Sequence, residues 1–154
     1  MSGVPVFEFR LDPWLVSTDP DRLDLTIIHH WLSTASYWAE GVPFEVVERG
    51  FRHSCAFGVY GEDGALAGWA RVVTDYATFA YLADVFILPP QRGRGLGKLL
   101  VEAALAHPAL QGLRRWLLMT RDAHGLYEQY GFTALKKPQN AMELHNPEIY
   151  LRGP

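Results

Sequence analysis

The feature that most constrains the fold is an apolar run that ends at two prolines and is followed at once by a glycine-rich loop. Phe79–Leu88 is apolar at nearly every position, a pattern typical of a central strand that is covered on both faces. Two prolines end this strand, and the loop Gln91–Lys98 contains three glycines at alternate positions. Apolar residues then recur at helical spacing over Lys98–His107. The chain is therefore expected to pass from a buried strand, through a flexible bend, into a helix.

Changes of period and turn residues predict further elements on both sides of this junction. Asp19 and Pro20 are typical of a helix start, since an aspartate caps free backbone amides and proline lacks the amide that would need a partner. Gly61–Gly64 separates two strand-like runs and suits a β-hairpin. The expected strands are Val6–Val16 with a break near Asp12, Cys55–Tyr60, Ala65–Thr74, Phe79–Leu88, Trp116–Thr120, Phe132–Leu135 and Met142–Leu144. The expected helices after the first are Phe44–Arg52, Lys98–His107 and Gly125–Tyr130.

The length of the chain and the order of these elements predict the fold class. A chain of 154 residues is long enough for one compact domain but not for two. A helix lies between the strands Phe79–Leu88 and Trp116–Thr120, so these strands are expected to be parallel neighbours. We therefore expect a single α/β domain of the α+β type over residues 1–154, with a mixed, mostly antiparallel sheet of six to seven strands flanked by helices.

Charge and cysteine content exclude several classes of function. The 14 basic and 17 acidic side chains give a formal charge of -3, so no overall positive field would attract nucleic acid or an anionic membrane. Cys55 is the single cysteine, which excludes an internal disulfide framework and fits a reducing compartment. The first residues lack the cationic and apolar stretches of an export signal, so a cytoplasmic protein without a membrane span is expected. The six histidines lack the spacing of metal ligands, so no metal site is expected.

The glycine loop has the composition of an anion site. Glycine lets the backbone approach a ligand closely, and the unpaired amides of a first helical turn attract negative charge together with the helix dipole. Arg92, Arg94 and Lys98 add positive charge, so a phosphate group is the expected ligand. The alternative is a tight strand-to-helix turn whose glycines serve packing alone.

Two better-known phosphate motifs do not fit this loop. A dinucleotide fingerprint is excluded because Lys98 occupies the position of its last glycine. A P-loop is excluded because Arg92 and Leu99 stand where a glycine and a hydroxyl residue are needed.

Two motifs, in the same order along the chain, resemble those of the GNAT N-acetyltransferase superfamily. The pattern Arg92-x-x-Gly95-x-Gly97, between a strand and a helix, is similar to the family's acyl-CoA loop. The run Leu126–Phe132, in which a tyrosine is followed by Gly-Phe after a short helix, resembles the second signature of the family. The resemblance covers Ala65–Phe132 in detail and implies a GNAT-like fold in which the two central parallel strands splay apart.

The resemblance also implies acetyl-CoA as co-substrate. Loop amides would hold the pyrophosphate of coenzyme A, and the strand before the loop would pair with the pantetheine arm as if with a partial extra strand. The implied binding residues are Val85, Phe86, Ile87, Arg92, Gly93, Arg94, Gly95, Leu96, Gly97 and Lys98.

Acetyl transfer to an amine needs a free amine lone pair, a stabilised oxyanion and a protonated leaving thiolate. Tyr127 is the candidate general acid, because the matching tyrosine of the family lies beside the sulfur and donates to it. The alternative is that Tyr127 is a core aromatic residue on a short helix, with Tyr130 as a structural partner.

The general base is indicated less directly. Several family members carry a glutamate four residues before the segment that matches Val85, and this chain has Tyr81 there. Asp84 is the only charged residue in its strand, and burial makes a carboxylate a stronger proton acceptor, so Asp84 is the candidate base. The alternative is a buried aspartate that is satisfied by backbone donors or by Arg71.

Aromatic walls and a carboxylate suit a cationic amine acceptor. The candidates for such a pocket are Tyr37, Trp38, Asp75, Tyr76 and Tyr81, each with core or surface filling as its alternative. We expect acetyl transfer from acetyl-CoA to a primary amine of a small molecule, by direct attack in a ternary complex, since no Cys or Ser stands in an activated setting. A protein or peptide acceptor and a non-catalytic acyl-CoA sensor are the alternatives, and an exposed strand edge is compatible with a homodimer.

Overall fold

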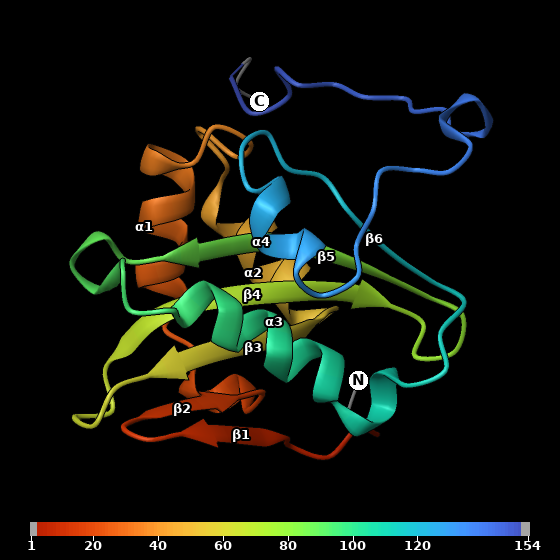
Figure 1. Ribbon diagram of the computed structural model, residues 1–154. Helices are drawn as coiled ribbons and strands as arrows, with labels where there is room; N and C mark the ends of the chain where they lie inside the picture. The colour runs from red at the N-terminus through yellow and green to blue at the C-terminus, as the bar shows by residue number, and fades with distance from the viewer. Residues whose placement is uncertain (1–2, 152–154) are drawn as a thin grey trace.

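The computed structural model describes residues 3–151 and has one six-stranded sheet in the order β1-β2-β3-β4-β5-β6. Helix α3 lies on one face of the sheet, and α1 and α2 lie on the other (Figure 1). The strands are β1 (Glu8–Leu11), β2 (Trp14–Ser17), β3 (Cys55–Tyr60), β4 (Leu66–Thr74), β5 (Phe79–Ile87) and β6 (Arg115–Leu118). The α-helices are α1 (Leu25–Ala35), α2 (Phe44–Arg52), α3 (Leu96–Ala106) and α4 (His124–Glu128). Short 3-10 turns are η1 (Pro20–Arg22), η2 (Pro89–Gln91), η3 (Pro108–Leu110) and η4 (Pro138–Asn140).

The predicted fold class is confirmed. Strands β1 to β5 are joined as antiparallel neighbours, and β5 and β6 are parallel, as expected for strands separated by a helical crossover. The pairing of β5 with β6 covers only Phe79–Leu82 and Arg115–Leu118. Beyond Leu82 the two strands separate, and Asp84 follows with a left-handed φ of 55°.

The amino-terminal region differs from the prediction in two respects. The single strand expected over Val6–Val16 is a hairpin of β1 and β2, because Asp12 and Pro13 form a tight turn that lets Leu11 pair with Trp14. Asp19 does cap a helical start, since its carboxylate accepts the Asp21 amide at 3.0 Å, but the start belongs to the 3-10 turn η1.

Helix α1 begins separately at Leu25. The carboxylate of Asp24 caps it by accepting the amide of Ile27 at 3.1 Å. The expected apolar stripe is present on this helix, with Ile28 and Leu32 buried against the sheet.

The strands predicted over Phe132–Leu135 and Met142–Leu144 are wrong for this structure. The Phe132 amide donates to the carbonyl of Tyr127 at 3.3 Å, which turns this backbone toward α4 instead of toward β6. The side chains of Met142 and Leu144 are 98% and 105% exposed, and their segment pairs with no strand of the described sheet. Between Thr133 and Ile149 the only regular structure is the turn η4, and every side chain is exposed.

Two hydrophobic layers hold the helices on the sheet. On the α3 face, Leu99 and Leu100 pack with Phe57 and Leu82, and on the other face Trp69 stacks on Phe86 with ring centroids 5.2 Å apart. Gly68 brings β4 close to β5, since a Cβ there would lie 2.7 Å from the Phe86 carbonyl oxygen. None of the helices in residues 3–151 has the length and apolar content needed to cross a bilayer.

The single cysteine lies inside the α3 layer. Cys55 is buried in β3, and its thiol shares a hydrogen bond with the hydroxyl of Tyr76. Burial raises the pKa of the Cys55 thiol to about 11.

His107 ends α3 inside the core. Its Nδ1 atom accepts the Ala109 amide at 3.0 Å, and its ring packs against Phe7 and Phe57 at centroid distances of 4.9 and 5.9 Å. The residue is 2% exposed, and its Nε2 atom has no hydrogen-bond partner among residues 3–151. Burial lowers the pKa of His107, because the charged imidazolium would lose its hydration.

This histidine makes the stability of the fold sensitive to acid. The unfolded chain binds the His107 proton near pH 6.5, whereas the folded chain resists it, so the free energy of unfolding should fall as the pH drops below about 6.5. The contribution should be fully present above that value. Urea unfolding at about pH 7.5 and about pH 5.5 measures this slope. His107→Asn should be less stable at the higher pH but should lose less stability between the two, and equal slopes for both chains would contradict the assignment.

Candidate functional site

The loop between β5 and α3 has an open backbone. Gly93 and Gly95 adopt φ values of 81° and 80°, and apart from their chain neighbours no described residue has an atom within 4 Å of the positions that their Cβ atoms would take. Gly95 is the N-cap of α3, and no side chain of the described residues caps this end of the helix. These two glycines provide the left-handed turns that a residue with a Cβ adopts only with strain.

The backbone amides from Gly93 to Lys98 have no hydrogen-bond acceptor within residues 3–151. The side chain of Leu96 is buried, so only its amide faces the loop, whereas Arg94 and Lys98 are exposed and form no ion pair in the described chain. Unpaired amides and the dipole of α3 make this bend a candidate anion site.

Arg92 fixes the loop to the end of β5. Its Nε atom donates to the carbonyl of Ile87 at 2.8 Å, and its guanidinium lies 5.0 Å from the centre of the Phe86 ring. The sequence suggested that Arg92 adds charge to the loop, and the structure shows in addition that its side chain positions the strand end.

The last residues of β5 are paired on one side only. Phe86 and Ile87 pair with Trp69 and Gly68 of β4, and the pairing with β6 has already ended at Leu82. The side of Val85–Ile87 that faces away from β4 is therefore open to an extended ligand.

Tyr127 is positioned by α4. Its side chain is 8% exposed and packs edge-on against Phe132, with ring centroids 5.9 Å apart. Its hydroxyl group has no hydrogen-bond partner in the described chain. Burial, and to a smaller extent the nearby Tyr37, raise the pKa of Tyr127, so its hydroxyl stays protonated at neutral pH. Tyr130 has the structural role, since its hydroxyl donates to Glu102 at 3.0 Å and ties α4 to α3.

Asp84 is held by two donors. One carboxylate oxygen accepts the Trp38 indole N–H at 2.7 Å, and the other accepts the Arg71 Nε at 2.7 Å. Arg71 is itself fixed by Ser54, whose Oγ atom lies 3.2 Å from its Nη1 atom. This ion pair with Arg71 is the alternative that the sequence left open for Asp84.

Aromatic residues surround this ion pair. Tyr37 packs edge-on against Trp38 with ring centroids 5.1 Å apart. Burial raises the pKa of Tyr81, and the neighbouring Asp84 and Tyr37 raise it further while Arg71 opposes the shift. Tyr37, Trp38, Tyr81 and Asp84 therefore come together where β5 and β6 separate.

Arg121 is a residue of this site that the sequence did not indicate. Its amide donates to the Tyr37 hydroxyl at 3.0 Å, and its guanidinium lies 3.9 Å from the centre of the Tyr37 ring. The two residues are 84 positions apart in the chain, so no local pattern signals their contact.

Asp75 and Tyr76 lie elsewhere. The Asp75 carboxylate accepts the Thr78 hydroxyl at 2.6 Å and the amides of Thr78, Ala77 and Phe79 in its own turn, and these bonds, the hydroxyl bond above all, lower its pKa. The Tyr76 hydroxyl contacts the buried Cys55. Both residues lie in the turn before the first residue of β5, whereas Asp84 lies near the other end of this strand. The structure therefore does not bring Asp75 and Tyr76 to the group around Asp84.

No group of three or more His, Cys, Asp or Glu side chains within residues 3–151 converges as a metal site would.

Comparison with known proteins gives the family. The model of the acetyltransferase (GNAT) family matches residues 25–132. An acetyltransferase of Gibberella zeae is 34% identical over 135 residues, which cover 74% of this chain and 75% of the relative.

Two crystal structures share the fold. An acetyltransferase of the GNAT family from Xanthomonas campestris pv. campestris is 50% identical, with a TM-score of 0.88 over 92% of this chain and 99% of that chain. An acetyltransferase of Clostridium acetobutylicum, crystallised with acetyl-CoA, is 15% identical and shows the fold alone, with a TM-score of 0.57 over 80% of this chain and 92% of that chain. The family match runs from α1 to the residue that packs on Tyr127, and the chain accordingly belongs to the GNAT family of N-acetyltransferases.

Proposed function

We propose that this protein acetylates a primary amine of a small molecule, by direct attack of the amine on acetyl-CoA in a ternary complex. The observation that supports the proposal is the row of unpaired amides from Gly93 to Lys98. These amides directly follow β5, whose last residues no longer pair with β6. A diphosphate fits the amides, and an extended arm fits the strand edge.

The described residues fit the acetyl donor that the family uses. The loop residues Arg92 to Lys98 would hold its pyrophosphate by main-chain donors, with Arg94 and Lys98 adding positive charge from the surface. The backbone of Val85, Phe86 and Ile87 would pair with its pantetheine arm. When bound, acetyl-CoA supplies an activated thioester, and the residues of the chain provide orientation and proton transfer.

We propose that Tyr127 donates a proton to the leaving sulfur. The amine nitrogen forms the new bond to the carbonyl carbon, the carbon–sulfur bond breaks, and the sulfur takes the Tyr127 proton. The raised pKa of Tyr127 keeps the proton on its hydroxyl until transfer. The base accepts the surplus proton of the amine, and solvent returns a proton to the Tyr127 hydroxyl.

We assign Asp84 as the group that receives the amine proton. An amine with a pKa near 10.4 is uncharged in roughly one molecule in a thousand at neutral pH, so a base beside the acceptor raises the rate. Each carboxylate oxygen has room for one more hydrogen bond besides those to Trp38 and Arg71. The aromatic rings of Tyr37, Trp38 and Tyr81 suit the cationic amine before it loses its proton.

The exposure of the aromatic residues favours a second candidate, a peptide acceptor. Tyr37 and Trp38 are 49% and 41% exposed, and an open mouth of this kind admits an extended chain. Thiol release from acetyl-CoA, measured over small amines, polyamines, aminoglycosides and peptides, separates the two. Turnover with peptides alone would overturn the small-molecule proposal, and tight binding of coenzyme A without release by any amine would indicate a sensor.

Gly95→Ala should weaken coenzyme A binding about tenfold, because the new Cβ disfavours the φ of 80° by about 1–2 kcal/mol and turns the loop amides away. Gly112→Ala is the matched control, since Gly112 also has a positive φ of 72° and an open Cβ position but lies outside the loop. Calorimetric titration should show the loss in the first variant alone. Equal affinities in both variants would contradict the loop site.

Tyr127→Phe should lower kcat by about 10²-fold or less, since a thiolate leaves fairly well without an acid, and it should leave coenzyme A affinity unchanged. Tyr130→Phe removes a hydroxyl from the same helix and should cost stability but not kcat. Steady-state rates with thermal unfolding of both variants test the assignment, which fails if Tyr127→Phe turns over like the unchanged enzyme.

Asp84→Asn should lower kcat by about 10²-fold and destabilise the fold by about 1.5–3 kcal/mol, because Arg71 loses its charged partner. Trp38→Phe breaks only the indole bond to Asp84 and should affect KM more than kcat. An Asp84→Asn enzyme that stays folded and keeps its kcat would show that Asp84 has a positioning role only.

A further inference from the structure

Two loops meet at the aromatic residues around Asp84. Tyr37 and Trp38 lie in the loop between α1 and α2, and Arg121 lies in the loop between β6 and α4. The Arg121 amide donates to the Tyr37 hydroxyl at 3.0 Å, and Figure 1 shows the second loop approaching the first. The backbone of Arg121 therefore fixes the position of Tyr37.

Tyr37 lies close to both residues that we assign to proton transfer. Its ring packs against Trp38, whose indole N–H donates to Asp84 at 2.7 Å. Burial raises the pKa of Tyr127, and the nearby Tyr37 raises it further. A group that is held against Tyr37 is thus held at the proposed acceptor side of the site.

The Arg121 guanidinium is such a group. It lies 3.9 Å from the centre of the Tyr37 ring, while its side chain is 64% exposed, which places the charge at the mouth of the site. Its Nη2 atom lies 3.8 Å from the Asp122 carboxylate, beyond hydrogen-bond distance, and an exposed pair of this kind contributes little. Contact with the ring restricts the guanidinium, whose fork of N–H donors matches the two oxygens of a carboxylate.

The charges around the aromatic residues favour an acidic group at this position. The Asp84 carboxylate is already paired with Arg71 at 2.7 Å, so Arg121 adds a positive charge that this pair does not balance. A second cationic group on the acceptor would be repelled here, and an anionic group would be attracted. One guanidinium balances the single charge of a carboxylate, whereas a phosphate dianion needs further donors.

We propose that Arg121 selects acceptors whose amine is joined by a spacer to a carboxylate. The amine lies at Asp84, and the carboxylate binds the Arg121 guanidinium beyond the rings of Trp38 and Tyr37. This selectivity rests on the acetyl transfer proposed above and narrows its acceptor to one class of amine. Polyamines and aminoglycosides, whose further charged groups are cationic, should be poor acceptors.

Linear amines of matched length that end in a carboxylate, a carboxamide or a second amine test the selectivity, over a series of spacer lengths. In thiol release from acetyl-CoA, kcat/KM should be about tenfold higher for the best carboxylate than for its carboxamide, and lowest for the diamine. The difference should lie in KM, because the charged end binds the ground state and the transition state alike. It should shrink in about 0.5 M salt, which screens exposed charges.

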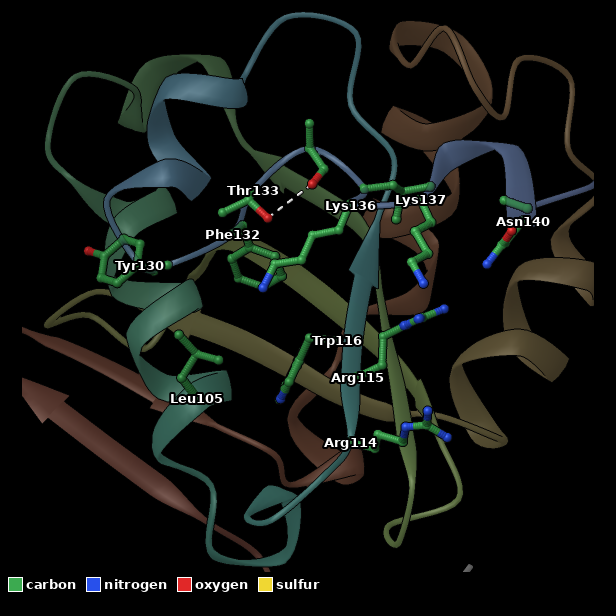
Figure 2. Close-up of a pocket in the computed structure, with 14 residues that line it drawn as sticks. Leu105, Arg114, Arg115, Trp116, Tyr130, Phe132, Thr133, Lys136, Lys137 and Asn140 are labelled. Atoms are coloured by element: carbon green, nitrogen blue, oxygen red, sulfur yellow. Dashed lines mark hydrogen bonds between the residues drawn. The ribbon is translucent and has the colours of Figure 1, made fainter.

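Arg121→Gln removes the guanidinium but keeps the backbone amide that holds Tyr37. It should raise KM for the carboxylate acceptor about tenfold and make the carboxylate and the carboxamide equal. Arg115→Gln is the matched control. Figure 2 shows Arg115 on β6, where it lines a separate cavity of about 580 Å³ to which Arg121 does not contribute, so this variant should keep the preference of the unchanged protein.

The outcomes separate this inference from the proposed function. Equal kcat/KM for carboxylate and carboxamide in the unchanged protein, or a preference that survives in Arg121→Gln or is lost in Arg115→Gln, would overturn the role of Arg121 and leave acetyl transfer standing. Binding of coenzyme A without thiol release by any amine of the series would overturn the proposed function and this role together.

Discussion

The separation of β5 from β6 after Leu82 is the constraint on which the geometry of the site depends. A parallel pair that continued to Ile87 would use the backbone groups of both strands in its own ladder. The opening is held by Asp84, whose φ of 55° costs about 1 kcal/mol and is fixed by a charged donor on β4 and a neutral donor in the loop after α1. The ion pair with Arg71 and the hydrogen bond from Trp38 thus connect the proposed acceptor side of the site to the shape of the sheet.

The glycine loop depends on the same strand. Its amides can face a common ligand only if the end of β5 stays in place. Leu88 is held there because its amide donates a hydrogen bond to the Ala67 carbonyl at 2.9 Å. The Arg92 side chain donates a hydrogen bond from the loop back to the Ile87 carbonyl, which links the loop to the end of β5. Rigid support of the proposed main-chain anion site would let the exposed cations of the loop add attraction without having to define its geometry.

The sequence predicted best those features that depend on neighbours along the chain. Cys55–Tyr60 and Phe44–Arg52 were predicted at their observed bounds, because period and turn residues are local signals. The hairpin at Asp12 and the missing strand at Met142 depend on which partner strand is available, and a single sequence does not contain that information.

The same limit applies to the site. Gly93 and Gly95 reveal the loop by residue type alone, and their positive φ values agree with it. Asp75 resembled a pocket residue in composition, yet its carboxylate is used by its own turn. The contact of Arg121 with Tyr37 arises only when the chain folds, because the two residues lie on segments that are distant in sequence.

The environment of Cys55 has a practical consequence for work on this enzyme. A thiol with a pKa of about 11 inside β3 is almost entirely protonated at neutral pH, and Cys55 is only 5% exposed, so we expect maleimides and oxidants to react with it slowly in the folded state. A cysteine introduced on the surface would therefore be the sole reactive thiol of the native protein. Fluorophores or spin labels can be attached at one chosen position with the native cysteine left in place.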